Sequence, residues 1–162
     1  MCSLTLCPVF RVHFIQTEIG GNSVVNLHDI SHADTQDFDG YKCLIIGCPT
    51  WILELQSNWE GFYDELDTIN FNNKKVAYFG ASDRVGYADD FQAAMGTLEK
   101  KISSLGGKTV SYWSTNGYDF NESKAVRDGR FVGLEIDENN QSELTTSCVK
   151  SWVTQLKRKF GL

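Results

Sequence analysis

The sequence lacks several features that would set it apart from ordinary globular proteins. No apolar run approaches the roughly 20 residues that a membrane-spanning helix needs, so we expect no membrane insertion. The segment from Cys2 to Phe10 is short and carries no basic residue, so it does not predict a secretory signal peptide. Repeats, low-complexity tracts and linkers are also absent. The 162 residues are enough to bury most of the unfolded surface, and they predict a single domain spanning residues 1–162.

Positive charge is in the minority. Lys and Arg number 15 against 21 Asp and Glu, which gives a net charge of −6 and argues against the basic surface that nucleic acid requires. This acidity permits steering towards basic protein partners, although composition alone favours a role in solubility. The cysteines follow no metal-ligand or disulfide spacing, which predicts reduced thiols in a reducing compartment and no metal site. They are Cys2, Cys7, Cys43, Cys48 and Cys148.

Strand-type and helix-type segments alternate along the chain. The apolar patterns predict strands over Ser23–Leu27, Tyr41–Gly47, Val76–Gly80 and Lys108–Trp113. Helices are predicted from a Ser57/Glu60 capping box, from an apolar series between Phe91 and Leu105, and from a second series between Val149 and Phe160. Alternation of this kind predicts an α/β doubly wound parallel sheet with helices on both faces.

About thirty residues separate Trp113 from the last helix, which is too long for a routine connection. Connections of this length usually carry function or structure of their own. The segment FVGLEI, residues Phe131–Ile136, is expected to resume the edge strand after this excursion. We therefore predict an insertion near the last strand.

The ends of two predicted strands carry the candidate site. The first runs as LIIGCPTW into a Pro-Thr turn followed by Trp51, and the second continues as FGASDRVGYADDF, with Asp83 and Tyr87 beyond its end. Ligands of open α/β sheets bind beyond the carboxyl ends of the strands. Two aromatics there can sandwich a planar ring, and Asp83 can accept a hydrogen bond from a ring N–H. Taken singly, Trp51 would more often be a packing residue and Asp83 a turn residue that bonds its own backbone.

Four segments carry a resemblance to long-chain flavodoxins of the cyanobacterial and algal type. They are GCPTW, ELQSNWEGFYDEL, the stretch from VAYFGASDRVGYADDF to RDGRFVGL, and KSWVTQL, and the resemblance runs from about Gly20 to Leu162. It implies a flavodoxin-like fold with one non-covalently bound FMN. It further implies a low-potential, one-electron carrier that substitutes for ferredoxin, and not an enzyme.

The same resemblance implies site residues and partners. Trp51 and Tyr87 would flank the flavin ring, with the other contacts from neighbouring loop residues. Together these residues are Thr50, Trp51, Ile52, Leu53, Ala81, Ser82, Asp83, Tyr87 and Asp90. The implied partners are redox proteins such as ferredoxin-NADP reductase and photosystem I. The implied state is a monomer in the cytoplasm or the plastid stroma.

The sequence departs from this family at the N-terminus. Family members begin with a strand and a T/S-x-T-G-x-T loop that binds the FMN phosphate at a helix start. Here the chain begins MCSLTLCPVFRVHF, with no glycine and with Ser3 and Thr5 as the only Ser or Thr residues. We expect the phosphate loop to be missing. MCSLTL is expected to supply a central strand, with Pro8 as the first residue of the helix.

Smaller departures affect the ring end of the site. The loop after Trp51 reads TWILEL where the family has TWNIGEL, so it is one residue shorter and has lost the glycine that makes a peptide flip easy. Ser82 replaces a common glycine, and Asp90 replaces an asparagine.

Two functional hypotheses therefore stay open. The first is an FMN electron carrier. The second is a degenerate flavodoxin-like domain with weak or absent FMN binding, which serves as an interaction module or has no function. A phospho-acceptor receiver domain of similar topology is set aside, because the strands ending in GCPTW and FGAS lack the required terminal Asp.

Overall fold

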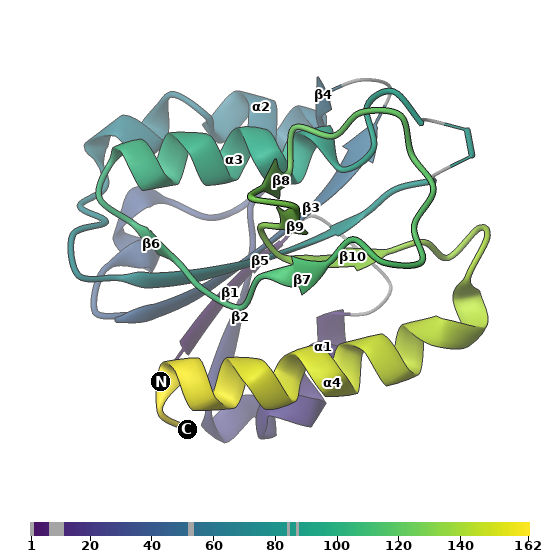
Figure 1. The fold of residues 1–162 in the computed structure, drawn as a ribbon. Helices are drawn as coiled ribbons and strands as arrows, with labels where there is room; N and C mark the ends of the chain where they lie inside the picture. The colour runs from purple at the N-terminus through teal and green to yellow at the C-terminus, as the bar shows by residue number, and fades with distance from the viewer. Residues whose placement is uncertain (1, 7–11, 52–53, 84, 87) are drawn as a thin grey trace.

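A parallel β-sheet forms the centre of the molecule (Figure 1). The computed structural model describes residues 2–6, 12–51, 54–83, 85–86 and 88–162, with the backbone alone at 2–6, 51 and 54. The strand order is β10-β5-β3-β1-β2. These strands are β1 (Cys2–Leu6), β2 (Val25–Asp29), β3 (Cys43–Trp51), β5 (Lys75–Ala81) and β10 (Leu134–Ile136). Two short strands extend the sheet: β4 (Glu54–Leu55) pairs with β3, and β6 (Lys108–Thr109) pairs with β5.

Strand β1 occupies the middle of this sheet. It pairs in parallel with β2 on one side and with β3 on the other, and Leu4 lies opposite both Leu27 and Ile45. The prediction that MCSLTL supplies the central strand is confirmed. The helix that follows is described from Val12 onward, so the predicted helix start at Pro8 lies outside the described residues.

Helices cover both faces of the sheet, which confirms the doubly wound class (Figure 1). One face carries α2 (Ser57–Phe62) and α3 (Ala93–Ser104), and the other carries α1 (Val12–Ile19) and α4 (Ser142–Phe160). Each face buries its own apolar cluster, with Trp59, Leu98 and Ile102 in one and Ile15, Trp152 and Leu156 in the other. Short 3₁₀ helices span η1 (Gly21–Ser23), η2 (Thr35–Phe38) and η3 (Glu65–Thr68).

Three local predictions were wrong. Strand β2 begins at Val25 and not at Ser23, because Gly21–Ser23 form a 3₁₀ turn. The predicted Pro-Thr turn is absent, because β3 runs on to Trp51 and its last residues pair with β4. The capping box is also absent, because helix α2 is capped by the Gln56 side chain, which accepts a hydrogen bond from the Asn58 N–H at 3.1 Å.

The predicted strand Lys108–Trp113 is broken. Strand β6 ends at Thr109, and Ser111 has a positive φ of 60° that takes the chain out of the sheet. The chain then enters a three-stranded antiparallel sheet of β7 (Trp113–Ser114), β9 (Arg130–Phe131) and β8 (Val126–Arg127).

Strand β10 then rejoins β5 over Leu134–Ile136, which confirms the predicted return of the edge strand after the insertion. The predicted start at Phe131 was wrong, because Phe131 belongs to β9. Gly133 allows this return because a Cβ there would lie 2.0 Å from the Tyr78 carbonyl oxygen. A glycine is therefore needed where the excursion crosses back over β5.

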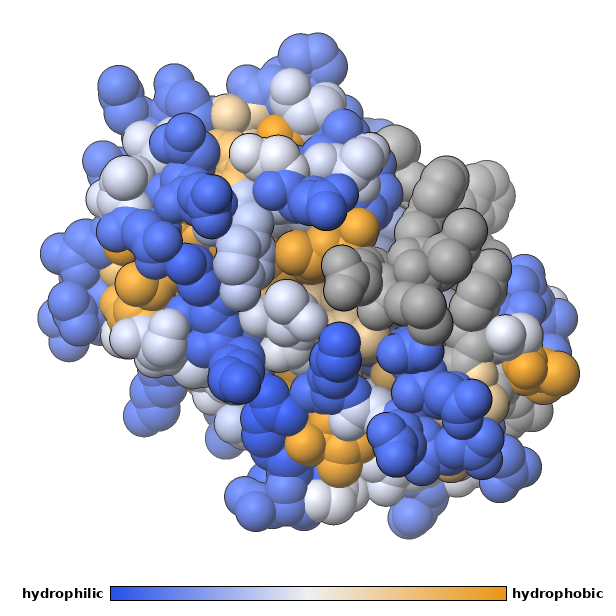
Figure 2. All heavy atoms as spheres, turned by 90° about the horizontal axis from the view of Figure 1, so that it is seen from above, coloured by the Kyte–Doolittle hydropathy of each residue, from blue (hydrophilic) through white to orange (hydrophobic). Residues whose placement is uncertain are grey.

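The surface above α2 and α3 is mainly hydrophilic. Hydrophobic side chains on this face form small, separate groups between hydrophilic ones (Figure 2). In the described part of the chain, the exposed large hydrophobic residues are Val85, Leu144 and Leu162. Within the same part, no helix is both long and apolar enough to cross a membrane.

Candidate functional site

The carboxyl ends of three strands lie side by side. Pro49 of β3 is opposite Ala81 of β5, and Ala81 is opposite Ile136 of β10. The Ser82 N–H continues the pairing by donating to the Ile136 carbonyl at 3.1 Å. Because Thr50 and Ser82 each follow this row by one residue, they come from neighbouring strand ends, with Thr50 still within β3 and Ser82 just beyond β5.

Thr50 links the end of β3 to the start of α3. Its side chain is buried, and its hydroxyl accepts a long hydrogen bond of 3.4 Å from the Ala94 N–H in the first turn of α3. This bond satisfies one of the amides that a helix leaves unpaired at its N-terminus. The hydroxyl hydrogen of Thr50 therefore points away from the helix amide and can be donated elsewhere.

The side chains of the two predicted aromatic walls, Trp51 and Tyr87, lie outside the described part of the structure. Trp51 ends β3, and its backbone lies opposite Glu54 of β4, so two residues join these strands. Those two are Ile52 and Leu53, and they lie with Tyr87 outside the described residues, as does the Trp51 side chain. The ring sandwich remains a prediction.

Asp83 forms the centre of a hydrogen-bond network. Its Oδ1 accepts from the backbone N–H groups of Val85 and Gly86, each at 2.9 Å. The side-chain amides of Asn140 and Asn139 donate to its two oxygens at 2.9 and 3.1 Å. The carboxylate therefore orders its own loop and joins it to the connection between β10 and α4.

This network also sets the ionisation of Asp83. The hydrogen bond from the Gly86 N–H, followed by those from the two asparagine amides, lowers the pKa of Asp83 from 3.8 to about 2. Each of these donors favours the ionised carboxylate over the neutral acid. Asp83 is thus a fixed negative charge at the end of β5 throughout the neutral range.

The network predicts a pH-dependent loss of stability. Because the folded pKa is depressed, the contribution of Asp83 is present above 3.8 and disappears as the pH falls through about 2. We expect Asp83→Asn to lower the urea midpoint at neutral pH and the difference from wild type to close between these two values. Asp119→Asn, with the same charge change at an exposed residue, is the control. A difference that stays constant down to pH 2 would show that the Asp83 charge is not involved.

Asp90 lies where the loop after β5 turns into α3. Its carbonyl accepts from the Ala93 N–H at 2.9 Å, and Gln92 between them has a positive φ of 59°. The Gln92 amide is fully buried and donates to Glu135 of β10 at 3.3 Å. These bonds fix the direction in which the loop enters the helix.

The long excursion supports the same loop from its other side. The backbone N–H groups of Asn121 and Glu122 donate to the Ala88 carbonyl at 2.9 and 3.2 Å. The Asn121 side-chain amide donates to Asp89 at 2.7 Å. The insertion therefore holds one wall of the candidate site.

Ser82 carries an unsatisfied polar group at this site. Its hydroxyl oxygen is buried and has no hydrogen-bond partner within the described part of the chain. Buried hydroxyls normally have a partner, so this oxygen indicates a place for an external donor or acceptor. The sequence predicted Ser82 as a contact residue.

Several supporting residues were missed by the sequence analysis. Asn139 and Asn140 hold Asp83 from more than fifty positions away, and their only local signal is a pair of turn-forming residues before a helix. Trp59 was not predicted to support the site, yet its indole N–H donates to the Gly47 carbonyl of β3 at 3.0 Å. Among the residues that the structure describes, no group of three His, Cys, Asp or Glu side chains could hold a metal ion.

Comparison with known proteins gives one consistent result. A profile described as Flavodoxin matches residues 15–152. A flavodoxin of Synechocystis sp. is 68% identical over 144 residues, which is 88% of this chain and 85% of that protein. A flavodoxin of Synechococcus elongatus is 64% identical over 149 residues, or 91% of this chain and 88% of that protein.

The solved structures agree on the fold. A Fusobacterium nucleatum flavodoxin bound to flavin mononucleotide superposes with a TM-score of 0.88, and the match covers 98% of each chain. The sequence identity in that match is 24%, so the similarity concerns the fold. The family profile and the sequence identities therefore give the same family, and the superposition gives the same fold.

Proposed function

Since the chain belongs to the flavodoxin family, we propose that it holds FMN at the carboxyl ends of β3 and β5 and carries single electrons at low potential. Flavodoxins are electron-transfer flavoproteins, so the chain is an FMN electron carrier and not an enzyme. The observation that carries the placement is the pairing of Pro49 with Ala81, which brings Thr50 and Ser82 to the carboxyl ends of adjacent strands. The strand order reverses between β1 and β3, and flavodoxin-like sheets are themselves a standard example of ligand binding at such a switch point.

The described residues fit the ring end of FMN. Ser82 offers a buried hydroxyl without a partner, and Thr50 offers a hydroxyl hydrogen beside it. Asp83 places a carboxylate at the same edge and orders the loop that follows it through the N–H groups of Val85 and Gly86. Trp51, Ile52, Leu53, Ala81, Tyr87 and Asp90 complete the proposed contact set.

The phosphate end fits less well. Ser3 and Thr5 are the only hydroxyl residues before Phe14, and both lie within β1, paired to β2 and β3. They are therefore strand residues and do not form a loop around a phosphate. We propose that the flavin ring supplies most of the binding free energy in this protein.

Bound FMN supplies the one-electron chemistry, and the protein sets its environment. The fixed Asp83 charge and the net charge of −6 both oppose further negative charge on the cofactor. That repulsion favours a low reduction potential and a role in place of ferredoxin. The function needs no nucleophile or general base from this chain.

The ring sandwich predicts the effect of removing Trp51. Loss of one aromatic stack on a heterocycle costs about 1–3 kcal/mol, so Trp51→Ala should bind FMN roughly 5- to 150-fold more weakly than wild type. Flavin fluorescence, quenched in the wild type, should rise in the variant. Both quantities can be read from a single fluorescence titration.

Tyr63→Ala is the matched control, because it removes a partly buried aromatic at the end of α2 whose ring interacts with Lys101. Its FMN affinity should equal that of the wild type. Unchanged affinity in Trp51→Ala would remove Trp51 from the site. An absence of flavin binding in the wild type itself would favour the degenerate interaction module over an electron carrier.

The acidic surface supports basic redox proteins as partners. We propose a flavoprotein reductase such as ferredoxin-NADP reductase and a photosynthetic donor such as photosystem I.

The high identity to cyanobacterial flavodoxins supports a cytoplasmic or plastid-stroma location. We further propose a monomer, and two apolar clusters on one sheet support a single domain over residues 1–162.

Electron transfer from such a reductase should slow as salt rises. Exposed charges are screened beyond a Debye length of about 8 Å at 0.15 M ionic strength. We expect the second-order rate in stopped-flow experiments to fall steadily between low and high salt. A rate independent of salt would contradict charge steering, and no transfer to the FMN-loaded protein would contradict the electron-carrier function.

A further inference from the structure

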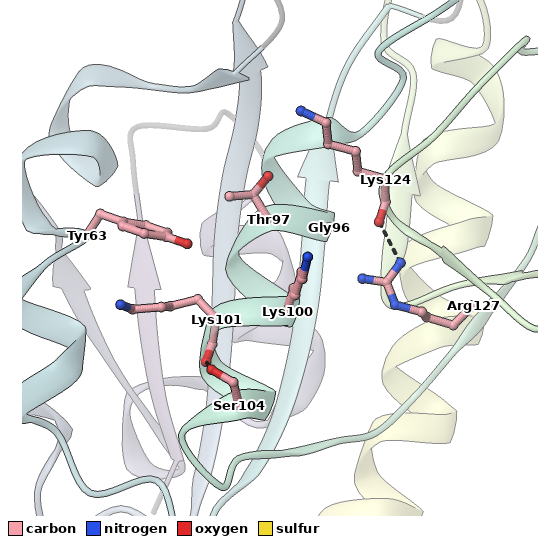
Figure 3. Close-up of a pocket in the computed structure, with 8 residues that line it drawn as sticks. All are labelled: Tyr63, Gly96, Thr97, Lys100, Lys101, Ser104, Lys124 and Arg127. Atoms are coloured by element: carbon pink, nitrogen blue, oxygen red, sulfur yellow. Dashed lines mark hydrogen bonds between the residues drawn. The ribbon is translucent and has the colours of Figure 1, made fainter.

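Two basic cavities lie outside the proposed flavin site, although the chain is acidic. The larger, of about 810 Å³, lies over α3 between the end of α2 and the excursion (Figure 3). Two of its cations are already neutralised: Lys101 Nζ is 2.6 Å from Asp67, and Arg127 is 3.0 Å from Glu99. Two further cations, Lys100 and Lys124, remain in this cavity to balance the charge of a ligand.

The second cavity, of about 600 Å³, is different in charge. It is lined by Lys75, Lys108, Arg130, Arg158 and Lys159, and no Asp or Glu lines it. None of these cations has a carboxylate partner within the part of the chain that the structure describes. Lys75 begins β5 and Lys159 is in the last turn of α4, so the cavity lies at the opposite end of the sheet from the proposed FMN site.

Helix capping explains part of this charge. Arg158 and Lys159 lie in the last turn of α4, where cations offset the helix dipole. The Lys75 ammonium donates to the Lys159 carbonyl at 2.5 Å and so satisfies one of the free carbonyls of the helix end. Lys108 and Arg130 come from β6 and β9 and have no such role.

The Arg130 side chain lies over an aromatic ring at the cavity. Its guanidinium carbon lies 5.0 Å from the centre of the Tyr112 ring, which also lines the cavity. A guanidinium that stacks on an aromatic face keeps its N–H groups free for an oxyanion. Its fork of donors matches the oxygens of a phosphate group.

Ser111 gives a second, independent indication of a ligand. It lines the cavity and is 3% exposed, and its hydroxyl oxygen has no hydrogen-bond partner among the described residues. Its φ of 60° is unusual for a residue other than glycine. The Trp152 indole N–H donates to its carbonyl at 3.1 Å and fixes the backbone there. An unsatisfied buried hydroxyl held in this way would be completed by a ligand oxygen.

We propose that this cavity is a binding site for a small anion that carries two or more phosphate groups. Its volume lies in the range of pockets that hold small molecules, about 300–1,000 Å³. Near neutral pH a single phosphate carries at most about two negative charges. Because five cations line the cavity, an anion with more phosphate groups matches the charge better. The site does not depend on FMN.

Inorganic pyrophosphate is the probe for a calorimetric titration of the FMN-loaded full chain at low salt. Wild-type protein should bind it, and the double variant Lys108→Gln/Arg130→Gln should bind it at least about tenfold more weakly, since two charge-assisted hydrogen bonds are lost. The matched control is Lys100→Gln/Lys124→Gln, which makes the same charge change in the cavity of Figure 3. That control should bind as the wild type does.

Ser111→Ala tests the hydroxyl and removes no charge. It should weaken pyrophosphate binding severalfold and leave the urea midpoint unlowered, because the lost hydroxyl has no partner in the described structure. If both double variants bound pyrophosphate equally weakly, the effect would come from non-specific charge and the proposal would be overturned. So would an absence of binding at millimolar pyrophosphate. Citrate binding as tightly as pyrophosphate would overturn the assignment to phosphate anions.

Discussion

Riboflavin should bind this protein almost as tightly as FMN does. A bound phosphate is normally held by several hydrogen bonds to a charged group, each worth about 1.5–3 kcal/mol. Losing two or three of them removes on the order of 5 kcal/mol, or more than a thousandfold in affinity. In this chain Ser3 and Thr5 are paired within β1, and the sequence from there to Phe14 has no glycine and no other hydroxyl residue.

Paired fluorescence titrations with FMN and riboflavin on the same protein test this expectation. The two dissociation constants should differ by less than about tenfold, or 1.4 kcal/mol. Trp51→Ala is the control, because loss of a ring contact should weaken both ligands by the same factor. A preference for FMN of a hundredfold or more would mean that the chain holds a phosphate site which its sequence does not reveal.

The sheet and the helices could be predicted because each apolar pattern is satisfied by only one way of burying its residues. A strand such as Val76–Gly80, apolar on successive residues, must be covered on both faces, and the alternation with helices supplies those covers. Element ends were harder to predict. Pro49 looked like a turn, yet β3 continues past it because β4 folds back to pair with Thr50 and Trp51. A pairing between strands is not visible in the local sequence of either one.

The candidate site likewise has features that the sequence predicts and features that it does not. Thr50, Ser82 and Asp83 could be predicted as neighbours, because parallel strands bring their carboxyl ends to one edge. The partners of Asp83 could not, because Asn139 and Asn140 reach it only after the excursion has closed. Of the two roles predicted for Asp83, the network shows the turn residue, which is also anchored to the connection between β10 and α4. Contact with a flavin N–H remains a prediction.

Trp59→Ala should destabilise the fold by about 3–5 kcal/mol, the usual cost of replacing a fully buried tryptophan by alanine. Trp59 has no exposed surface, and it joins α2 to the centre of β3 by donating its indole N–H to the Gly47 carbonyl at 3.0 Å. The alanine variant leaves a cavity and a carbonyl oxygen without its partner, and both effects act on the strand that carries Thr50.

Urea unfolding of the FMN-free protein measures this loss directly. Trp113→Ala is the matched control, since Trp113 is only partly buried and its indole N–H bonds the Tyr118 hydroxyl in the excursion. The control should lose clearly less stability than Trp59→Ala. A loss below about 1.5 kcal/mol for Trp59→Ala would show that α2 repacks against β3 without it. Because β3 positions one wall of the proposed flavin site, the same variant should also bind FMN more weakly at urea concentrations where it stays folded.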